Sequence, residues 1–226
     1  LMRKEEPGSD ITVPKKGLLI SATGTGKTYA SAFALKAIQP KRALFLVHRE
    51  QIARKSLESY RHVMGQSYTY GVFIGQQQET DRDIVFATMQ TMVKHLNDGT
   101  FAPTEFDVIV IDEVHRAGAA SYDRIMQHFK PKLWFGMTAT PERPDGFDVY
   151  GLFGNYILTE IRLQQALAND LLCPFHYFGI SGLSVNDKDY EAKDFSKLAS
   201  DDRVEHILKQ SAYYGYSGVR LKALVF

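Results

Sequence analysis

Short runs of apolar residues alternate with helical patterns along most of the chain. The runs of strand length occupy residues 17–21, 43–47, 71–74, 84–87, 106–111 and 133–137. Between several of them, apolar residues recur at every third or fourth position, as in residues 30–38 and 52–60, and this spacing predicts helices. The runs are continuous rather than alternating, so we expect a mainly parallel sheet with helices on both faces. The pattern as a whole predicts an α/β fold.

The pattern loosens after Pro141. Pro144, Asp145 and Gly146 mark a loop, and a short helix is expected over residues 160–168. Further strand, helix and strand patterns follow at residues 175–180, 201–214 and 221–226. We therefore expect a first domain over residues 1–170, and a connector with the start of a second, truncated domain over residues 171–226.

Composition narrows the class of protein. The 226 residues are 44% hydrophobic and 23% charged, which is typical of a globular soluble protein. No apolar run approaches the roughly 18 residues that a membrane span needs, and no secretory signal opens the chain. Cys173 is the single cysteine, which excludes an internal disulfide and fits a cytoplasmic location. The net charge is +1, so a polyanion would have to be held by a local surface.

A glycine-rich segment, SATGTGKT at residues 21–28, lies between the first predicted strand and the first predicted helix. This is the context of a phosphate-binding loop. Gly24 and Gly26 would let backbone N–H groups turn around a polyphosphate, Lys27 would reach its β- and γ-phosphates, and Thr28 would offer a hydroxyl to Mg²⁺. The candidate nucleotide-binding residues are Thr23, Gly24, Thr25, Gly26, Lys27 and Thr28. The alternative is an ordinary strand-to-helix turn with a solvated lysine; the general pattern also has Gly where Ser21 stands.

Two adjacent carboxylates, Asp112 and Glu113, follow the apolar run at residues 106–111. In open α/β sheets ligands bind at the carboxyl ends of strands, where these side chains should lie. Asp112 would hold Mg²⁺, and Glu113 would orient and deprotonate the water that attacks the γ-phosphate. Together with Lys27 they form the candidate catalytic set. The alternative is an acidic strand end that caps the next helix.

Three motifs, ATGTGKT at 22–28, DEVH at 112–115 and TAT at 138–140, resemble motifs I, II and III of the DEAD/DEAH-type helicases and translocases of superfamily 2. The resemblance covers residues 17–180, and motif I of that family commonly has no leading Gly, which accommodates Ser21. The stretch from His115 to Arg143 is most similar to the translocases of type I and III restriction systems and to repair and defence helicases. The resemblance implies a RecA-like P-loop NTPase lobe that uses ATP and Mg²⁺.

The same resemblance assigns roles to further residues. His115, Thr138, Ala139 and Thr140 would couple the γ-phosphate to domain movement. Two lesser motifs, at residues 47–51 and 87–91, resemble segments that touch the nucleic-acid backbone in that family, and their candidate contacts are His48, Arg49, Thr88 and Gln90. The alternatives are a plain strand end for residues 138–140, a solvated helix start at His48 and Arg49, and helix capping at Thr88 and Gln90. Arg116 and Arg143 are interpreted as surface residues.

The resemblance also implies partners. DNA ranks above RNA, a second RecA-like lobe of the full-length protein would supply an arginine finger, and a nuclease would belong to a fused domain or an associated subunit. Without that finger we expect the chain alone to hydrolyse little ATP. The family's adenine-reading glutamine has no counterpart in residues 1–16. The competing hypotheses are a nucleotide-dependent switch or adaptor without motor activity and, less favoured, a metal-dependent nuclease using Asp112 and Glu113.

Overall fold

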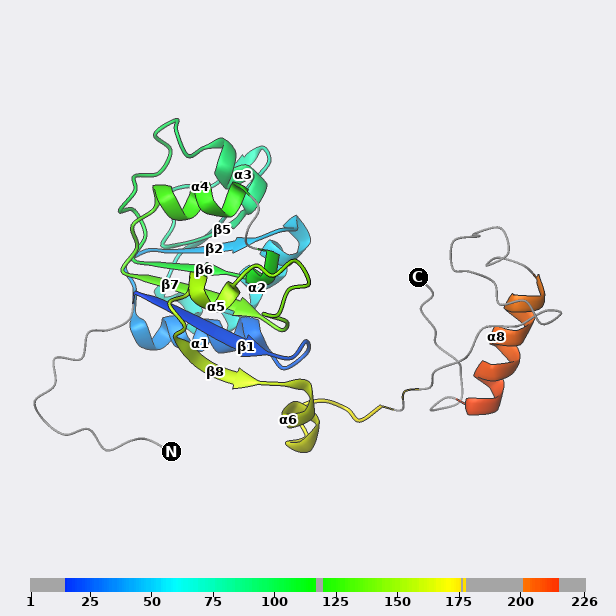
Figure 1. Ribbon diagram of the computed structural model, residues 1–226. Coiled ribbons are helices and arrows are strands. Elements are labelled where there is room, and N and C mark those ends of the chain that lie inside the picture. The colour runs from blue at the N-terminus through cyan, green and yellow to red at the C-terminus, as the bar shows by residue number, and fades with distance from the viewer. Residues whose placement is uncertain (1–14, 117–119, 176, 178–200, 216–226) are drawn as a thin grey trace, which may run out of the picture. The chain divides into compact units, whose positions relative to one another are not determined.

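The structure is a computed structural model that describes residues 15–116, 120–175, 177 and 201–215 (Figure 1). Its contacts divide the chain into two units, Leu1–Cys173 and Pro174–Phe226. This division lies close to the boundary predicted after residue 170. That the second unit begins another RecA-like lobe stays a prediction.

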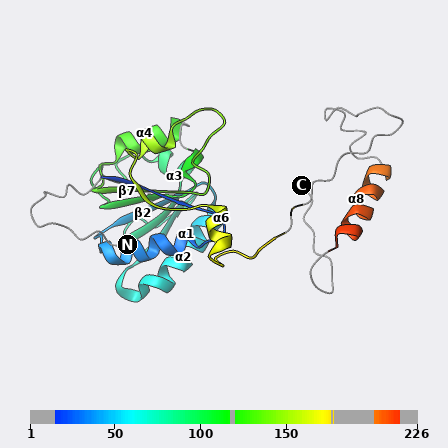
Figure 2. The same cartoon turned by 60° about the horizontal axis from the view of Figure 1, so that its bottom comes forward.

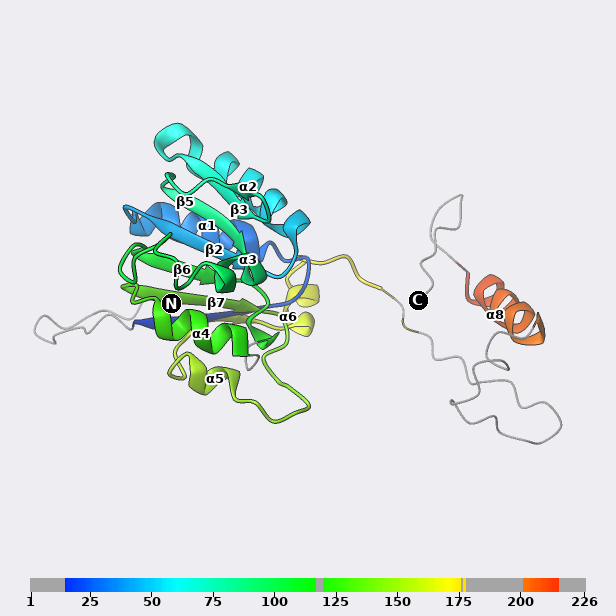
Figure 3. The same ribbon diagram turned by 90° about the horizontal axis from the view of Figure 1, so that it is seen from above.

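The first unit is built on one sheet of eight strands in the order β4-β3-β5-β2-β6-β7-β1-β8 (Figure 3). All neighbouring strands are parallel except β3 and β4. The strands are β1 (Lys16–Ser21), β2 (Ala43–Val47), β3 (Tyr70–Ile74), β4 (Gln77–Gln78), β5 (Ile84–Thr88), β6 (Val108–Ile111), β7 (Leu133–Thr138) and β8 (Ile157–Ile161). The predicted mainly parallel α/β fold is therefore confirmed.

Helices cover both faces of the sheet, with α1 and α2 on one face and α3 and α4 on the other (Figure 2). The helices of the first unit are α1 (Lys27–Ile38), α2 (Glu50–Met64), α3 (Met89–Lys94), α4 (Ala120–His128), α5 (Val149–Leu152) and α6 (Leu163–Ala168), with 3₁₀ turns at Gly65–Ser67 and Val114–Arg116. Successive strand residues face opposite layers. Leu18 and Ile20 accordingly pack with the α4 side, while Leu19 packs with α1 and α2.

The structure corrects the predicted helix over residues 160–168. Glu160 and Ile161 belong to β8, which pairs with β1, and the helix begins only at Leu163. β8 lies at the edge of the sheet and its residues are largely exposed. The polar positions Thr159 and Glu160 therefore interrupt the continuous apolar pattern that marks the central strands.

In the second unit the structure describes one helix, α8 (Asp201–Tyr214), where a helix was predicted. The strand predicted at 221–226 and most of the strand predicted at 175–180 fall outside the described residues. Within the described part of the chain, no helix combines the length and apolar character needed to cross a membrane.

Gly136 in β7 offers a direct test of the packing beneath the strand ends. A Cβ atom at this position would lie 2.5 Å from Cζ of Phe153, a side chain with no exposed surface. We expect Gly136→Ala to destabilise the fold by about 1–3 kcal/mol, because a buried ring must move. Urea unfolding of the single variant, and of the same change in a Phe153→Leu background, measures this cost. An equal cost in both backgrounds would contradict the proposed clash.

Candidate nucleotide and nucleic-acid site

The loop between β1 and α1 has the backbone that a phosphate cradle requires. Gly24 and Gly26 adopt φ angles of 89° and 87°, a region in which residues with a Cβ are strained. Around Gly26 a Cβ would meet nothing within 4 Å, so the space beside the loop is open. Thr23, Gly24 and Gly26 are exposed, while Thr25, Lys27 and Thr28 are half-buried.

The start of α1 also favours an anion. The residue before its first turn, Gly26, provides no side-chain cap, and the first turn contains no acidic residue. The N–H groups of that turn therefore have no side-chain cap of their own, and the positive end of the helix dipole points toward the loop. The predicted nucleotide-binding residues are thus brought together around a site whose chemistry suits a polyphosphate.

Ser21, where the general pattern has glycine, stabilises the loop. Its buried hydroxyl lies 2.5 Å from Oγ1 of Thr25, which donates to the carbonyl of Ala22 at 2.7 Å. Because the Thr25 proton is used in that bond, Ser21 is the donor to Thr25. The ammonium of Lys27 donates to the carbonyl of Ser21 at 3.1 Å. The side chain at position 21 therefore supports the loop instead of obstructing it.

Asp112 follows β6 and is almost fully buried, with 9% of its surface exposed. Burial, together with the charge of the adjacent Glu113, raises the pKa of its carboxyl group to about 6, although the hydrogen bond from the Glu113 N–H and the charge of Lys27 act in the opposite direction. The charged form is therefore disfavoured unless a positive group faces it. A carboxylate in this position, opposite the hydroxyl-bearing loop, has the donor type that Mg²⁺ prefers.

Glu113, His115 and Thr138 form a connected cluster. Nδ1 of His115 lies 3.0 Å from a carboxylate oxygen of Glu113 and 3.0 Å from the hydroxyl of Thr138. Since a carboxylate only accepts, this arrangement requires the proton on Nδ1. Thr138 is fully buried and accepts from the backbone N–H of Thr140 at 3.1 Å. The predicted coupling residues of the second and third motifs are thus in contact; Ala139 continues the same segment and is half-buried.

Arg143 was interpreted as a surface residue, and the structure corrects this. Its side chain is 20% exposed and donates to the carbonyl of His115 at 2.5 Å and to Asp145 at 2.8 Å. The guanidinium also stands over the ring of Phe147. Arg143 therefore fastens the segment after the third motif to the DEVH turn. Arg143 lies 28 residues after His115, so no local sequence pattern indicated this contact.

The four predicted nucleic-acid contacts differ in their surroundings. Arg49 and Gln90 are exposed, while His48 is half-buried and its Nε2 lies 2.6 Å from the hydroxyl of Tyr122. Thr88 is buried, and its side chain caps α3 by accepting from the N–H of Thr91. The capping alternative accounts for the Thr88 side chain. Contact with nucleic acid stays a prediction for all four.

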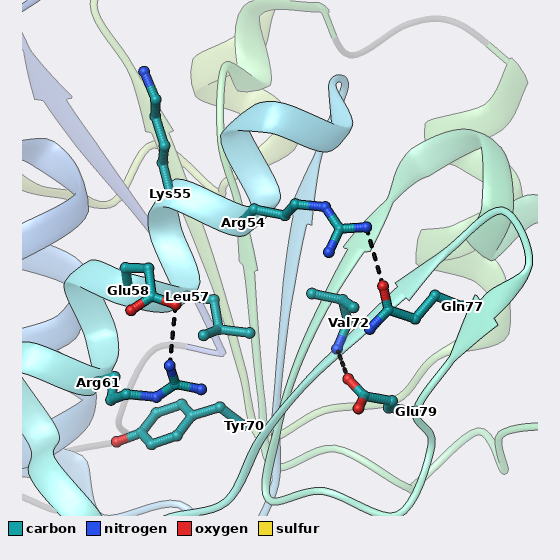
Figure 4. Close-up of a pocket in the computed structure, with 9 residues that line it drawn as sticks. All are labelled: Arg54, Lys55, Leu57, Glu58, Arg61, Tyr70, Val72, Gln77 and Glu79. Atoms are coloured by element: carbon teal, nitrogen blue, oxygen red, sulfur yellow. Dashed lines mark hydrogen bonds and ion pairs between the residues drawn. The ribbon is translucent and has the colours of Figure 1, made fainter.

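A separate cavity of about 440 Å³ lies between α2, β3 and β4 (Figure 4). Arg54 reaches from α2 to Gln77 at 3.0 Å, Glu79 accepts from the N–H of Val72, and Arg61 pairs with Glu58. None of the predicted site residues lines it. The contact between Arg54 and Gln77 connects β4 to α2, while Arg61 and Glu58 pair within α2.

The family model described as "Type III restriction enzyme, res subunit" matches residues 5–143. The chain belongs to this family. The match includes the predicted phosphate-binding loop, the DEVH turn and the TAT segment, which the fold brings to one edge of the sheet.

Known relatives and structures agree with this assignment. The type I restriction enzyme EcoAI endonuclease subunit of Escherichia coli is 28% identical over 87% of this chain and 28% of its own length. The Hef helicase domain of Pyrococcus furiosus matches with a TM-score of 0.54 at 24% identity, over 66% of this chain and 35% of its own. The type ISP restriction-modification enzyme LlaGI, solved with a DNA substrate mimic, matches with a TM-score of 0.54 at 20% identity, over 87% of this chain and 21% of its own. These structural matches show the RecA-like helicase fold.

The chain spans about a quarter of the length of these curated relatives, 28% of the EcoAI subunit and 22% of a Staphylococcus aureus type I subunit.

The segment after the third motif is also tied to the end of β8. Arg162 donates to both carboxylate oxygens of Glu142, at 2.8 and 2.5 Å, and to the hydroxyl of Tyr150 at 2.9 Å. The guanidinium of Arg162 lowers the pKa of Glu142 to about 2. This ion pair connects two loops at the same edge of the sheet.

We predict a pH-dependent role for this pair. A carboxyl group whose pKa is lowered by folding stabilises the fold above its unfolded pKa, and this contribution disappears as the pH falls through the folded value. Arg162→Gln should therefore lower the free energy of unfolding at pH 7 by less than about 1 kcal/mol, because Glu142 is solvent-exposed, and the difference should shrink between pH 4 and pH 2. Urea unfolding across this range, with the exposed Arg124→Gln as control, measures it. A difference that stays constant with pH would contradict the prediction.

Proposed function

We propose that this chain is the ATP-binding motor lobe of an ATP-dependent helicase or translocase acting on DNA, which hydrolyses ATP when joined to a second lobe. The observation that carries the proposal is the meeting of a phosphate cradle with Asp112, Glu113 and His115 at one edge of the sheet. A protein that only binds nucleotide needs the cradle but no hydrolytic base. Here Glu113 is present beside the cradle as a candidate base. His115 contacts both Glu113 and Thr138, and so connects this base to the last residue of β7.

Each polar group at this edge has a defined part in the proposed reaction. Lys27 and the first turn of α1 hold the phosphates, and Thr28 with Asp112 holds Mg²⁺. When bound, Mg²⁺ neutralises charge on the phosphate oxygens. Glu113 accepts a proton from the attacking water, and His115 orients its carboxylate through the contact at 3.0 Å. The arginine finger that the resemblance implies belongs to the second lobe.

DNA is the proposed substrate because two of the proteins named above are restriction enzymes, one of them solved with a DNA substrate mimic. With a net charge of +1, the protein would use a local track instead of a basic surface. Arg49 is exposed at the start of α2 and can donate to a phosphate oxygen there. His48 and Gln90 lie at the neighbouring strand ends of β2 and β5.

The nucleotide site can be tested by two substitutions in the full-length protein. Lys27→Ala should weaken ATP binding about 10- to 100-fold, because a charge-assisted contact is lost. Glu113→Gln should keep ATP binding and lower hydrolysis by about 10²–10⁴. Titration with a fluorescent ATP analogue and a phosphate-release assay measure both, with Lys130→Ala as the matched control on an exposed lysine. Wild-type binding in Lys27→Ala would refute the site.

The nucleic-acid surface can be tested by its salt dependence. Arg49→Ala should weaken binding of single-stranded DNA and reduce the slope of log affinity against log salt by about one, as expected for the loss of one phosphate contact. Fluorescence anisotropy at several salt concentrations measures this slope. Arg124→Ala removes an exposed arginine from another helix and should leave the slope unchanged. An unchanged slope in Arg49→Ala would remove this residue from the interface.

A further inference from the structure

The predicted nucleic-acid contact at His48 and the DEVH turn are structural neighbours. Strands β2 and β6 are paired, and the N–H of Asp112 donates to the carbonyl of Leu46 at 2.9 Å. A cavity of about 330 Å³ opens between the two strand ends, with His48 and Arg49 on one side and Asp112, Glu113 and His115 on the other. A strand held at His48 would therefore lie within a side chain's length of the catalytic turn.

Tyr122 contacts a residue on each side of this cavity, His48 on one side and Glu113 on the other. Its ring is buried in the core, with 1% exposed, and its hydroxyl lies 2.6 Å from Nε2 of His48 and 3.5 Å from the carbonyl oxygen of Glu113. Nε2 of His48 accepts from this hydroxyl when the ring proton is on Nδ1, and the single hydroxyl proton is then not available to Glu113. The distances show that the contact with His48 is the strong one in this structure and the contact with Glu113 the weak one.

The backbone conformation of Glu113 should respond to whether Tyr122 donates to His48 or to Glu113. Its φ angle is +53°, in the left-handed region that a residue with a side chain adopts only when its surroundings hold it there. Its N–H donates to a carboxylate oxygen of Asp112 at 3.0 Å, and its own carboxylate is 3.0 Å from His115. The backbone carbonyl of Glu113 is a third point of contact, and its neighbour there is the hydroxyl of Tyr122. A stronger hydrogen bond to this carbonyl would hold the backbone of Glu113, and with it the carboxylate, more firmly in one orientation.

We propose that Tyr122 is a positioning residue that links nucleic-acid contact at His48 to the placement of Glu113. In the tautomer of His48 that carries its proton on Nε2 and none on Nδ1, Nε2 donates to a backbone phosphate and no longer accepts from Tyr122. The ring exchanges this proton with water, and the Tyr122 hydroxyl then donates to the carbonyl of Glu113. This donation holds the strained backbone in the orientation that hydrolysis needs. The link rests on the proposed function, because it requires Glu113 to be the base and His48 to face the strand.

The test is the stimulation of ATP hydrolysis by single-stranded DNA in the full-length protein. Tyr122→Phe removes only the hydroxyl and should lower the stimulated kcat by about threefold to tenfold, the effect of one ordinary hydrogen bond, with the KM for ATP and the affinity for DNA unchanged. Tyr60→Phe is the matched control: this tyrosine is also fully buried, and its hydroxyl donates to Ser31 at 2.8 Å on the other face of the sheet. It should leave stimulation as in the wild type.

A double-variant cycle separates a link from two independent effects. If His48 and Tyr122 act through one contact, His48→Ala with Tyr122→Phe should be no worse than the more severe single variant. His48→Gln, which retains a polar group near the hydroxyl, should recover part of the stimulation lost in His48→Ala. Should Tyr122→Phe unfold, the two His48 variants still report on the link, and equal stimulation in both would overturn it.

Two failures are distinguishable. Wild-type stimulation in Tyr122→Phe, or multiplicative effects in the double variant, would overturn the link while the loss of activity in Lys27→Ala still supported the proposed function. Absence of any DNA stimulation in the wild-type protein would overturn both.

Discussion

The backbone ladder of the parallel strands is the interaction on which the site depends. Thr138 lies beside Ile20, Gly136 beside Ile111, and Ile111 beside Leu46. Because these strands run in one direction, the residues that follow each of them emerge at the same edge of the sheet. Segments more than one hundred residues apart in sequence therefore meet through main-chain hydrogen bonds. The side chains of the site are therefore not needed to hold the segments together, and their types can suit the chemistry of the site.

That freedom has an energetic cost, which is visible at Asp112. Burial disfavours its charge and raises its pKa to about 6, although Lys27 partly compensates. A well-packed apolar side chain at this position would be less costly to fold. The carboxyl group is tolerated because the N–H of Asp112 is bonded to β2 and the strand beneath it is fully buried. The central strands thus supply the stability that the strand ends lack.

Most of the fold and the conformation of the glycine-rich loop could be predicted from the sequence because both leave local signals. Central strands are continuous apolar runs, and Gly24 and Gly26 mark the turn that only glycine makes easily. β8 was missed because an edge strand carries no such run and is defined by its pairing with β1. Tyr122 and Arg143 were missed as parts of the site because their partners, His48 and His115, lie 74 and 28 residues away. Such contacts become visible only when the sheet is assembled.

The conformation of Glu113 explains why a single hydroxyl can matter at this edge. A residue in a relaxed backbone conformation lies in a deep minimum, and one additional hydrogen bond changes its position little. A left-handed residue other than glycine is held by its surroundings against a cost of order 1–3 kcal/mol, which is comparable with the energy of one hydrogen bond. Its orientation therefore responds to the donor at its carbonyl. Because the ring of Tyr122 is packed in the core, this donor has a fixed position beside the strained residue.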